Sequence, residues 1–148
     1  MAEPLVRQLH IDAPREIVFD CFCDPRALVT WMGDKADLEP RAGGAFGVDI
    51  NGVLVRGRYE VVDRPNRLVF SWGMLDSQDM PPGSTSVEVI LTANGEATEL
   101  TLRHHNLPPD QLELHGIGWG HFLERLAVAA AGNDPGPDPW AAASPGGS

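Results

Sequence analysis

The sequence has 148 residues, a formal net charge of −10 and 43% hydrophobic residues, with a mean hydropathy of −0.16. A chain of this length and composition is expected to form one globular domain, and no run approaches the roughly 18 apolar residues of a membrane span. The acidic balance argues against nucleic acid and against an anionic membrane as partners, because both attract clustered Lys and Arg side chains.

The first part of the chain predicts a strand and two short helices. The strand covers residues 5–12, and Pro14 follows with a backbone angle that suits the first turn of a helix. Apolar side chains between Ile17 and Phe22 recur at helical spacing. The pair Asp24-Pro25 repeats the start signal and predicts a second helix that runs to Trp31.

The first of these helices carries both cysteines of the chain, Cys21 and Cys23. Two positions apart on a helix, they point to different sides, and they match no zinc-binding spacing. We interpret them as ordinary thiols in a reducing compartment. Residues 1–12 contain no apolar segment of the kind found in secretion signals, so the expected location is the cytoplasm.

A loop over residues 33–45 leads into a series of antiparallel strands with explicit turns. Asn51-Gly52 and Asn94-Gly95 are both type I′ hairpin signals, and a third turn is predicted around Pro65-Asn66. These turns predict five cross-strand pairs: Val48 with Val55, Tyr59 with Trp72, Val61 with Phe70, Val87 with Leu102, and Val89 with Leu100.

The predicted registers separate the side chains of these strands into an apolar and a polar face. The apolar face collects Phe46, Val48, Val55, Tyr59, Val61, Phe70, Trp72, Val87, Val89, Leu100 and Leu102. The polar face collects Asp49, Arg56, Arg58, Glu60, Ser71, Glu88, Thr101 and Arg103. An antiparallel sheet with one face on the core and the other in water shows such a split.

The last predicted element is an amphipathic helix that begins at Asp110, whose side chain is placed to cap it. Its apolar stripe consists of His115, Trp119, Phe122 and Leu126. Glycines at 116, 118 and 120 interrupt this helix. They either let it approach a strand or a ligand closely, or they mark a helix that becomes regular only after Gly120. Both interpretations stay open.

Residues 1–131 are therefore expected to form one folded domain. The remaining residues, 132–148, are rich in Pro, Gly and Ser and show no periodicity. This composition predicts a disordered tail, in which only Trp140 could anchor the chain.

An ordered set of motifs runs from Leu5 to about Ala131. It comprises Ile11-Asp12-Ala13-Pro14, Asp24-Pro25 followed by Trp31, Gly43-Gly44, Gly57-Arg58-Tyr59, the strand from Arg67 to Trp72, Leu107-Pro108, and Gly118-Trp119 followed by Phe122-Leu123-Glu124-Arg125-Leu126. In this order and spacing the chain resembles the START-like, or SRPBCC, superfamily, and within it the homologues of the ninety-kilodalton heat-shock-protein ATPase activator.

The resemblance implies an α+β helix-grip fold. In that fold a curved antiparallel sheet wraps around a long C-terminal helix, two short helices follow the first strand, and a cavity lies between sheet and helix. This chain differs from the pattern at Met32, where many relatives carry a second tryptophan, so one wall of the pocket is expected to differ.

The sequence contains no recognisable catalytic constellation. There is no nucleophile elbow, no P-loop and no HExxH motif, and the glycines at 116, 118 and 120 lack dinucleotide-binding spacing. A zinc site built on His104 and His115 is disfavoured, because no ligand pair lies three or four positions apart on a helix. We therefore expect no catalytic residue, no metal and no cofactor.

Aromatic and histidine side chains on the predicted inner faces are the candidates for lining a ligand pocket, since pockets are mostly apolar with a few placed polar groups. The candidates are Trp31, Tyr59, Trp72, His104, His115, Trp119 and Phe122. A different possibility is that the aromatic side chains fill the core and that each histidine is bonded within it, which is the favoured interpretation for His104 and His115. Met74, Leu75 and Met80 belong either to an adaptable lid or to an ordinary surface loop.

Together these features favour a cytoplasmic binding protein that holds a small hydrophobic or aromatic molecule between the sheet and the C-terminal helix. A second hypothesis is a polyketide-cyclase-type enzyme in which His104, His115 or Tyr59 positions or protonates an aromatic intermediate. Resistance to a toxic metabolite by sequestration also fits the superfamily, and the family name suggests a chaperone-interacting module. A homodimer is left open.

Overall fold

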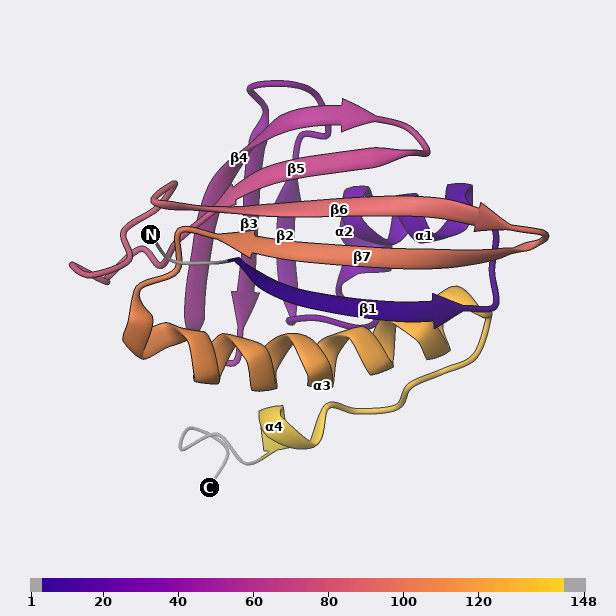
Figure 1. Cartoon of the computed structure of the whole chain (residues 1–148). Helices are drawn as coiled ribbons and strands as arrows, with labels where there is room; N and C mark the ends of the chain where they lie inside the picture. The colour runs from indigo at the N-terminus through magenta and orange to yellow at the C-terminus, as the bar shows by residue number, and fades with distance from the viewer. Residues whose placement is uncertain (1–3, 143–148) are drawn as a thin grey trace.

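The computed structural model describes residues 4–142 and is organised around one curved antiparallel sheet of seven strands in the order β1-β7-β6-β5-β4-β3-β2 (Figure 1). The strands are β1 (Leu5–Ile11), β2 (Lys35–Leu38), β3 (Ala45–Ile50), β4 (Val53–Asp63), β5 (Arg67–Trp72), β6 (Thr85–Asn94) and β7 (Ala97–His105). The helices are α1 (Arg15–Cys23), α2 (Pro25–Leu28), the short 3₁₀ helix η1 (Pro109–Gln111), α3 (Leu112–Ala130) and α4 (Pro139–Ala142).

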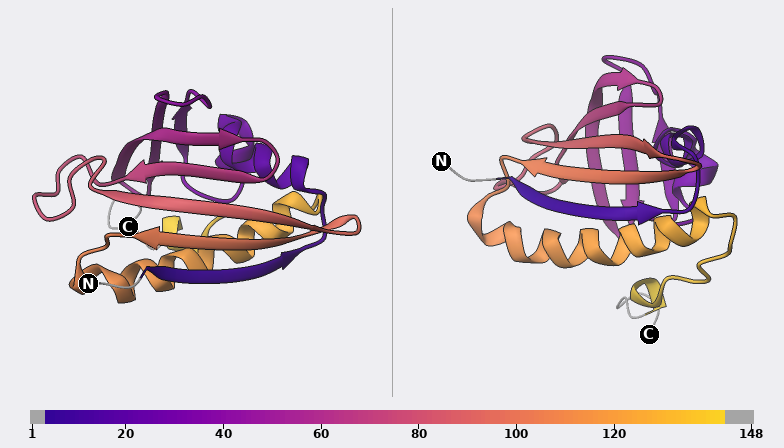
Figure 2. Two further views of the ribbon diagram at one scale, coloured as in Figure 1. Left: turned by 45° about the horizontal axis from the view of Figure 1, so that its top comes forward. Right: turned by 45° about the vertical axis from the view of Figure 1, so that its right-hand side comes forward.

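The long helix α3 runs along the inner face of the sheet, and α1 and α2 lie beside its C-terminal end (Figures 1 and 2). The core between these layers is aromatic: Phe22, Phe46, Tyr59 and Phe70 are each at most 1% exposed. The predicted helix-grip fold is confirmed.

The apolar stripe predicted for the last helix is also present, because Trp119, Phe122 and Leu126 are buried. The start of the helix differs from expectation: Asp110 lies in η1, and α3 has no side-chain cap. Since Asp110 sits in a tighter 3₁₀ turn, it precedes the first α-helical turn rather than capping it.

The glycines lie inside a regular helix, so α3 does not begin only after Gly120. At Gly116 an added Cβ atom would lie 2.6 Å from Nη2 of Arg7 and 3.5 Å from Cδ1 of Leu5. Gly116 thus lets α3 pack closely against β1. Gly118 and Gly120 have open space beside them, and the helix does not need them for packing.

The β3–β4 hairpin has the predicted register, with Val48 opposite Val55 and the turn at Asn51-Gly52. The β6–β7 register needs a correction. Asn94 is itself paired, with Ala97, so Gly95 and Glu96 form the turn and Val89 faces Leu102 instead of Leu100. A shift of two residues keeps every side chain on its predicted face, since strand side chains alternate with period two.

The β4–β5 register needs a different correction. Tyr59 pairs with Phe70 and Val61 pairs with Val69, with a β-bulge between the two pairs. A bulge inserts one extra residue and therefore reverses the facing of the residues after it. Val61 leaves the apolar face for this reason, and Val62 packs against the core in its place.

Two further segments differ from the sequence-based expectation. Residues 35–38, within the expected loop, form the edge strand β2 against β3, and the second helix is a single turn, Pro25–Leu28, capped by Asp24.

The expected disordered tail began at residue 132. The structure places residues 132–142 along α3 and forms α4 from part of them, while residues 143–148 lie outside the described residues.

Candidate functional site

A partly open cavity of about 280 Å³ lies between the N-terminal half of α3 and the adjoining ends of β3, β4 and β5. Its wall consists mainly of apolar side chains from these elements. It is lined by Met32, Ile50, Asn51, Val53, Val55, Trp72, Met74, Leu114, His115, Gly118, Trp119, Phe122 and Trp140. The cavity sits where the first turns of α3 pass the turn of the β3–β4 hairpin.

Four of the seven residues proposed from the sequence line this cavity: Trp72, His115, Trp119 and Phe122. The other three, Trp31, Tyr59 and His104, are fully buried behind it. Tyr59 and His104 lie on the inner face of the sheet but are completely covered by other core side chains. Trp31 follows α2 and is covered in the same way.

His104 holds a chain of buried hydrogen bonds. Its Nδ1 atom accepts from Nε1 of Trp119 at 3.0 Å, so the ring proton is on Nε2, which donates to Oγ1 of Thr85 at 2.8 Å. Thr85 in turn donates to the carbonyl of Trp72 at 2.7 Å. Burial lowers the pKa of His104 to about 3, which keeps the ring neutral. His104 therefore orients the indole of Trp119 and is linked through Thr85 to the backbone of Trp72.

Trp31 and Tyr59 are similarly satisfied inside the core. The indole of Trp31 donates to the carbonyl of Cys21 at 3.0 Å, and the hydroxyl of Tyr59 donates to the carbonyl of Phe22 at 3.0 Å. Burial raises the pKa of Tyr59 well above its ordinary value. Both side chains tie α1 to its neighbours, and neither offers a polar atom to a ligand.

Trp72 contributes an unsatisfied donor at the cavity. It is 5% exposed, and its Nε1 atom has no hydrogen-bond partner within residues 4–142. Its ring centroid lies 5.2 Å from that of Trp119 and 6.4 Å from that of His115. A buried N–H group without a partner costs about 1–3 kcal/mol, and an acceptor that reached this group would recover that cost.

His115 contributes an acceptor. Its Nδ1 atom donates to the carbonyl of Gln111 at 3.2 Å, which leaves the lone pair on Nε2, and that atom bonds to nothing in the described part of the chain. Burial lowers the pKa of His115, so the ring is neutral at pH 7. The cavity thus combines apolar walls with one side-chain acceptor, and an unpaired donor is buried in the neighbouring indole of Trp72.

Within residues 4–142, no group of three or more His, Cys, Asp and Glu side chains is placed to hold a metal ion. The two cysteines are unpaired, and burial raises the pKa of Cys21 to about 11 and that of Cys23 to about 12. Neither thiol is activated as a nucleophile.

Several residues of the cavity wall were not among the seven candidates for lining a pocket. Met74 was assigned from the sequence either to a lid or to an ordinary surface loop. It forms an isolated bridge with Val55 and lines the cavity, whereas Met80 is fully buried. Met32, where the family pattern was expected to differ, is also in the wall. Trp140 is the least expected member, because its segment carries no periodic signal.

The fold is similar to that of several known proteins. The AHSA1-like protein of Rhizobium etli is 40% identical, over 93% of this chain and 87% of that one, with a TM-score of 0.74. An Hsp90 activator from Plasmodium falciparum is 23% identical, over 86% of this chain and 95% of that one, with a TM-score of 0.73.

A third similar structure is DynU16, a protein of the dynemicin biosynthetic locus, which is 24% identical with a TM-score of 0.77. The match covers 91% of this chain and 50% of that one, so this chain spans half the length of DynU16. The two likenesses below 25% identity show the fold alone. No curated protein matches the sequence.

No helix within residues 4–142 combines the length and the apolar character needed to cross a membrane.

The family model described as Activator of Hsp90 ATPase homolog 1-like protein matches residues 12–131, from the end of β1 to the end of α3. The chain therefore belongs to the family of Activator of Hsp90 ATPase homolog 1-like proteins, within the SRPBCC superfamily.

Proposed function

We propose that this protein binds a small, flat, apolar molecule that carries a polar group, in the cavity between α3 and the sheet. The size of the cavity supports a ligand of about two fused rings. Its volume of about 280 Å³ compares with roughly 150 Å³ for an engineered apolar cavity that takes up benzene.

The observation that carries the proposal is a largely apolar, aromatic wall that includes one free acceptor, Nε2 of His115. A ligand hydroxyl would donate to this atom, and a ligand oxygen would satisfy the buried N–H group of Trp72 once the indole shifts to expose it. A phenol-like or keto-substituted ring system meets both requirements. Pockets of this kind use apolar burial for affinity and a few polar groups for orientation.

A cyclase-type enzyme has less support. Both ring nitrogens of His104 are bonded, and the hydroxyl of Tyr59 donates to a buried carbonyl. Neither group can exchange a proton with a ligand without breaking a core contact. Of the three residues considered for that chemistry, only His115 lines the cavity.

We place the binding activity in the cytoplasm, which the unpaired cysteines favour.

The test is a binding measurement with a matched pair of helix variants. Gly118 lines the cavity and Gly120 does not, yet an added Cβ atom meets nothing within 4 Å at either position. Gly118→Leu should fill the cavity, whereas Gly120→Leu should leave it open. Isothermal titration calorimetry with 2-naphthol should give a dissociation constant in the micromolar range, about −8 kcal/mol, for the wild type and Gly120→Leu, and no binding for Gly118→Leu.

Native mass spectrometry of freshly purified protein would show whether a small molecule of similar size co-purifies. Equal binding by Gly118→Leu and Gly120→Leu would place the ligand elsewhere. Absence of binding by the wild type, both to 2-naphthol and to any co-purified molecule, would contradict the proposed function.

A further inference from the structure

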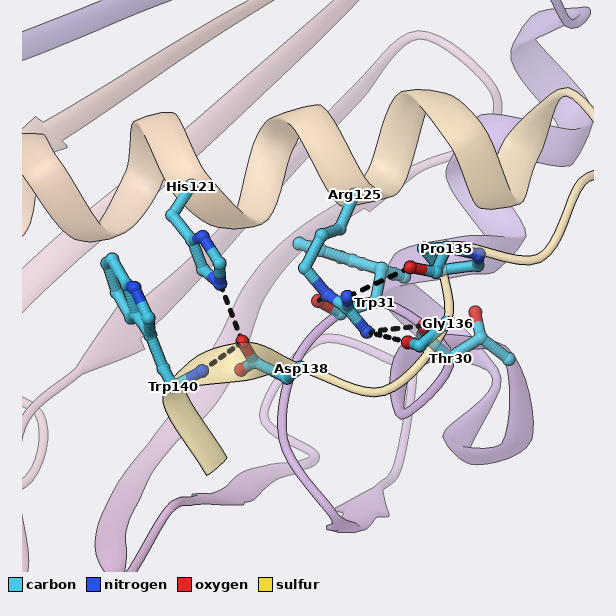
Figure 3. Close-up of polar contacts among 8 residues, drawn as sticks. All are labelled: Thr30, Trp31, His121, Arg125, Pro135, Gly136, Asp138 and Trp140. Carbon is cyan, nitrogen blue, oxygen red and sulfur yellow. Dashed lines mark hydrogen bonds and ion pairs between the residues drawn. The ribbon is translucent and has the colours of Figure 1, made fainter. Parts of the chain in front are cut away.

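The chain continues past the end of α3 in an organised segment. Residues 133–142, here called the C-terminal strap, return along α3 and end in the short helix α4 (Figures 1 and 3). The family model ends at residue 131, so the strap lies beyond the residues that the model matches.

Arg125 on α3 anchors the first half of the strap. Its guanidinium donates to the carbonyl of Gly136 at 2.9 Å and to that of Pro135 at 3.4 Å. The same side chain also donates to the carbonyl of Trp31 at 3.2 Å and to that of Thr30 at 3.4 Å. One side chain therefore joins the strap, α3 and the segment after α2 (Figure 3).

His121 and Asp138 anchor the second half. Oδ1 of Asp138 lies 2.8 Å from Nε2 of His121 and accepts from the backbone N–H of Trp140 at 3.0 Å. The two side chains are only 18% and 13% exposed. Asp138 thus caps the first turn of α4 and holds the backbone of Trp140 against α3.

These anchors place the indole of Trp140 at the cavity. One ring face stacks on His121, with centroids 3.7 Å apart and an interplanar angle of 9°. The ring also meets Phe122 edge to face at 5.6 Å, and it belongs to the cavity wall. Trp140 is nevertheless 39% exposed, so a bound ring system would find uncovered aromatic surface there.

We propose that Trp140 contacts the ligand directly and that the C-terminal strap completes the binding site, with Asp138 as the residue that positions Trp140. This inference rests on the proposed function and adds to it a specificity element beyond the residues that the family model matches. Its chemistry favours flat aromatic ligands, because the exposed part of an indole pairs with another ring by offset stacking or edge-to-face contact.

The experiment titrates 2-naphthol by calorimetry into the wild type and three variants. Trp140→Ala should bind about tenfold more weakly, as expected when an aromatic contact is lost, and Trp140→Phe should stay within about threefold of the wild type. Val128→Ala is the control, because Val128 is also 39% exposed on α3 and does not line the cavity.

The role of Asp138 is tested by a double-mutant cycle. Asp138→Ala should weaken binding by a similar factor in the wild-type background and should have no further effect in Trp140→Ala, because it acts through the indole. Additive losses would show that Asp138 affects binding by another route and would overturn its positioning role.

The outcomes separate this inference from the proposed function. Wild-type affinity in Trp140→Ala, together with lost binding in Gly118→Leu, would overturn the strap inference and leave the cavity function standing. A tenfold loss in Val128→Ala would show that any apolar truncation on this helix weakens binding and would also overturn it. No binding by the wild type would overturn both.

Discussion

Single residues decide what the cavity can recognise. His115 presents an acceptor and Trp72 carries a buried, unpaired donor, while His104 has both ring nitrogens occupied by neighbours. These residues share one aromatic cluster: the rings of His104 and His115 lie 5.3 Å apart. Their roles differ because their hydrogen-bond partners differ, and two histidines with the same sequence signal thus become one structural and one candidate binding residue.

The neutral state of His104 makes stability depend on pH. Its pKa of about 3 in the folded protein lies below the value of about 6.5 expected in the unfolded chain. Between these values the unfolded chain binds the proton and the folded protein does not, so stability falls as the pH is lowered through this window. From pH 7 to pH 5 the loss should be about 2 kcal/mol.

Urea denaturation at pH 7, 6 and 5 measures this dependence, with His104→Gln as the comparison. The variant has no imidazole to protonate at this position and should show a flatter pH dependence. An equal dependence in both proteins would mean that His104 is not the group responsible.

Trp119 and Trp140 both line the cavity but should differ sharply in their effect on stability. Trp119 is 3% exposed and Trp140 is 39% exposed. Trp119→Ala removes a buried aromatic side chain and leaves Nδ1 of His104 without its donor, so it should cost about 3–5 kcal/mol. Trp140→Ala should cost less than about 1 kcal/mol.

Chemical denaturation of the two variants beside the wild type provides the measurement. A near-zero change for Trp119→Ala would contradict the close packing of α3 on the sheet. A loss for Trp140→Ala as large as that for Trp119→Ala would mean that the strap is part of the core.

At the scale of elements, α3 determines the site because one helix supplies packing and lining at once. Trp119 and Phe122 belong to both the core and the cavity wall, and Gly116 brings the helix close to β1. The other face of the helix receives the strap through His121 and Arg125 (Figure 3). The sheet ends and the strap therefore meet at one stretch of α3.

The glycines of α3 allow a prediction at this scale. Gly120 sits in the helix interior, and an added Cβ atom meets nothing within 4 Å. Gly120→Ala should therefore raise the free energy of unfolding by about 0.5–1 kcal/mol, because alanine loses less backbone entropy in a helix. Thermal or urea denaturation measures this, and a decrease in stability would contradict the open space next to Gly120.

At the scale of the whole molecule, the sheet and α3 enclose a space that the core does not fill. Residues from distant parts of the described chain contribute to its wall, from Met32 to Trp140. A ligand in this space would bind the folded protein and not the unfolded chain, so binding and folding are thermodynamically linked.

This linkage predicts that 2-naphthol stabilises the protein. At a ligand concentration one hundred times the dissociation constant, the wild type should gain about 2.7 kcal/mol, seen as a higher melting temperature. Gly118→Leu should show no such increase, while Gly120→Leu should respond as the wild type does. An equal increase in all three proteins would indicate that 2-naphthol binds outside the cavity.

The periodicity of the sequence by itself determined the strands, the helices and the facing of most strand residues, and the family resemblance implied the helix-grip fold. Val87, Val89, Leu100 and Leu102 are buried as the alternating pattern predicts, even though the β6–β7 register is shifted by two residues. Facing depends only on whether a residue is odd or even along its strand, which is a local property. The bulge in β4 breaks that rule, and it reversed Val61.

Tertiary structure alone decided which inward side chains reach the cavity. His104 and His115 both carry the inward signal, but only the packing of Trp119 and Thr85 around His104 makes it a core residue. Trp140 reaches the site because His121, Arg125 and Asp138 hold the strap. The strap shows no periodicity in the sequence, and its contacts join it to residues of α3. The burial of His104 and the docking of the strap on α3 therefore arise only when the chain is folded.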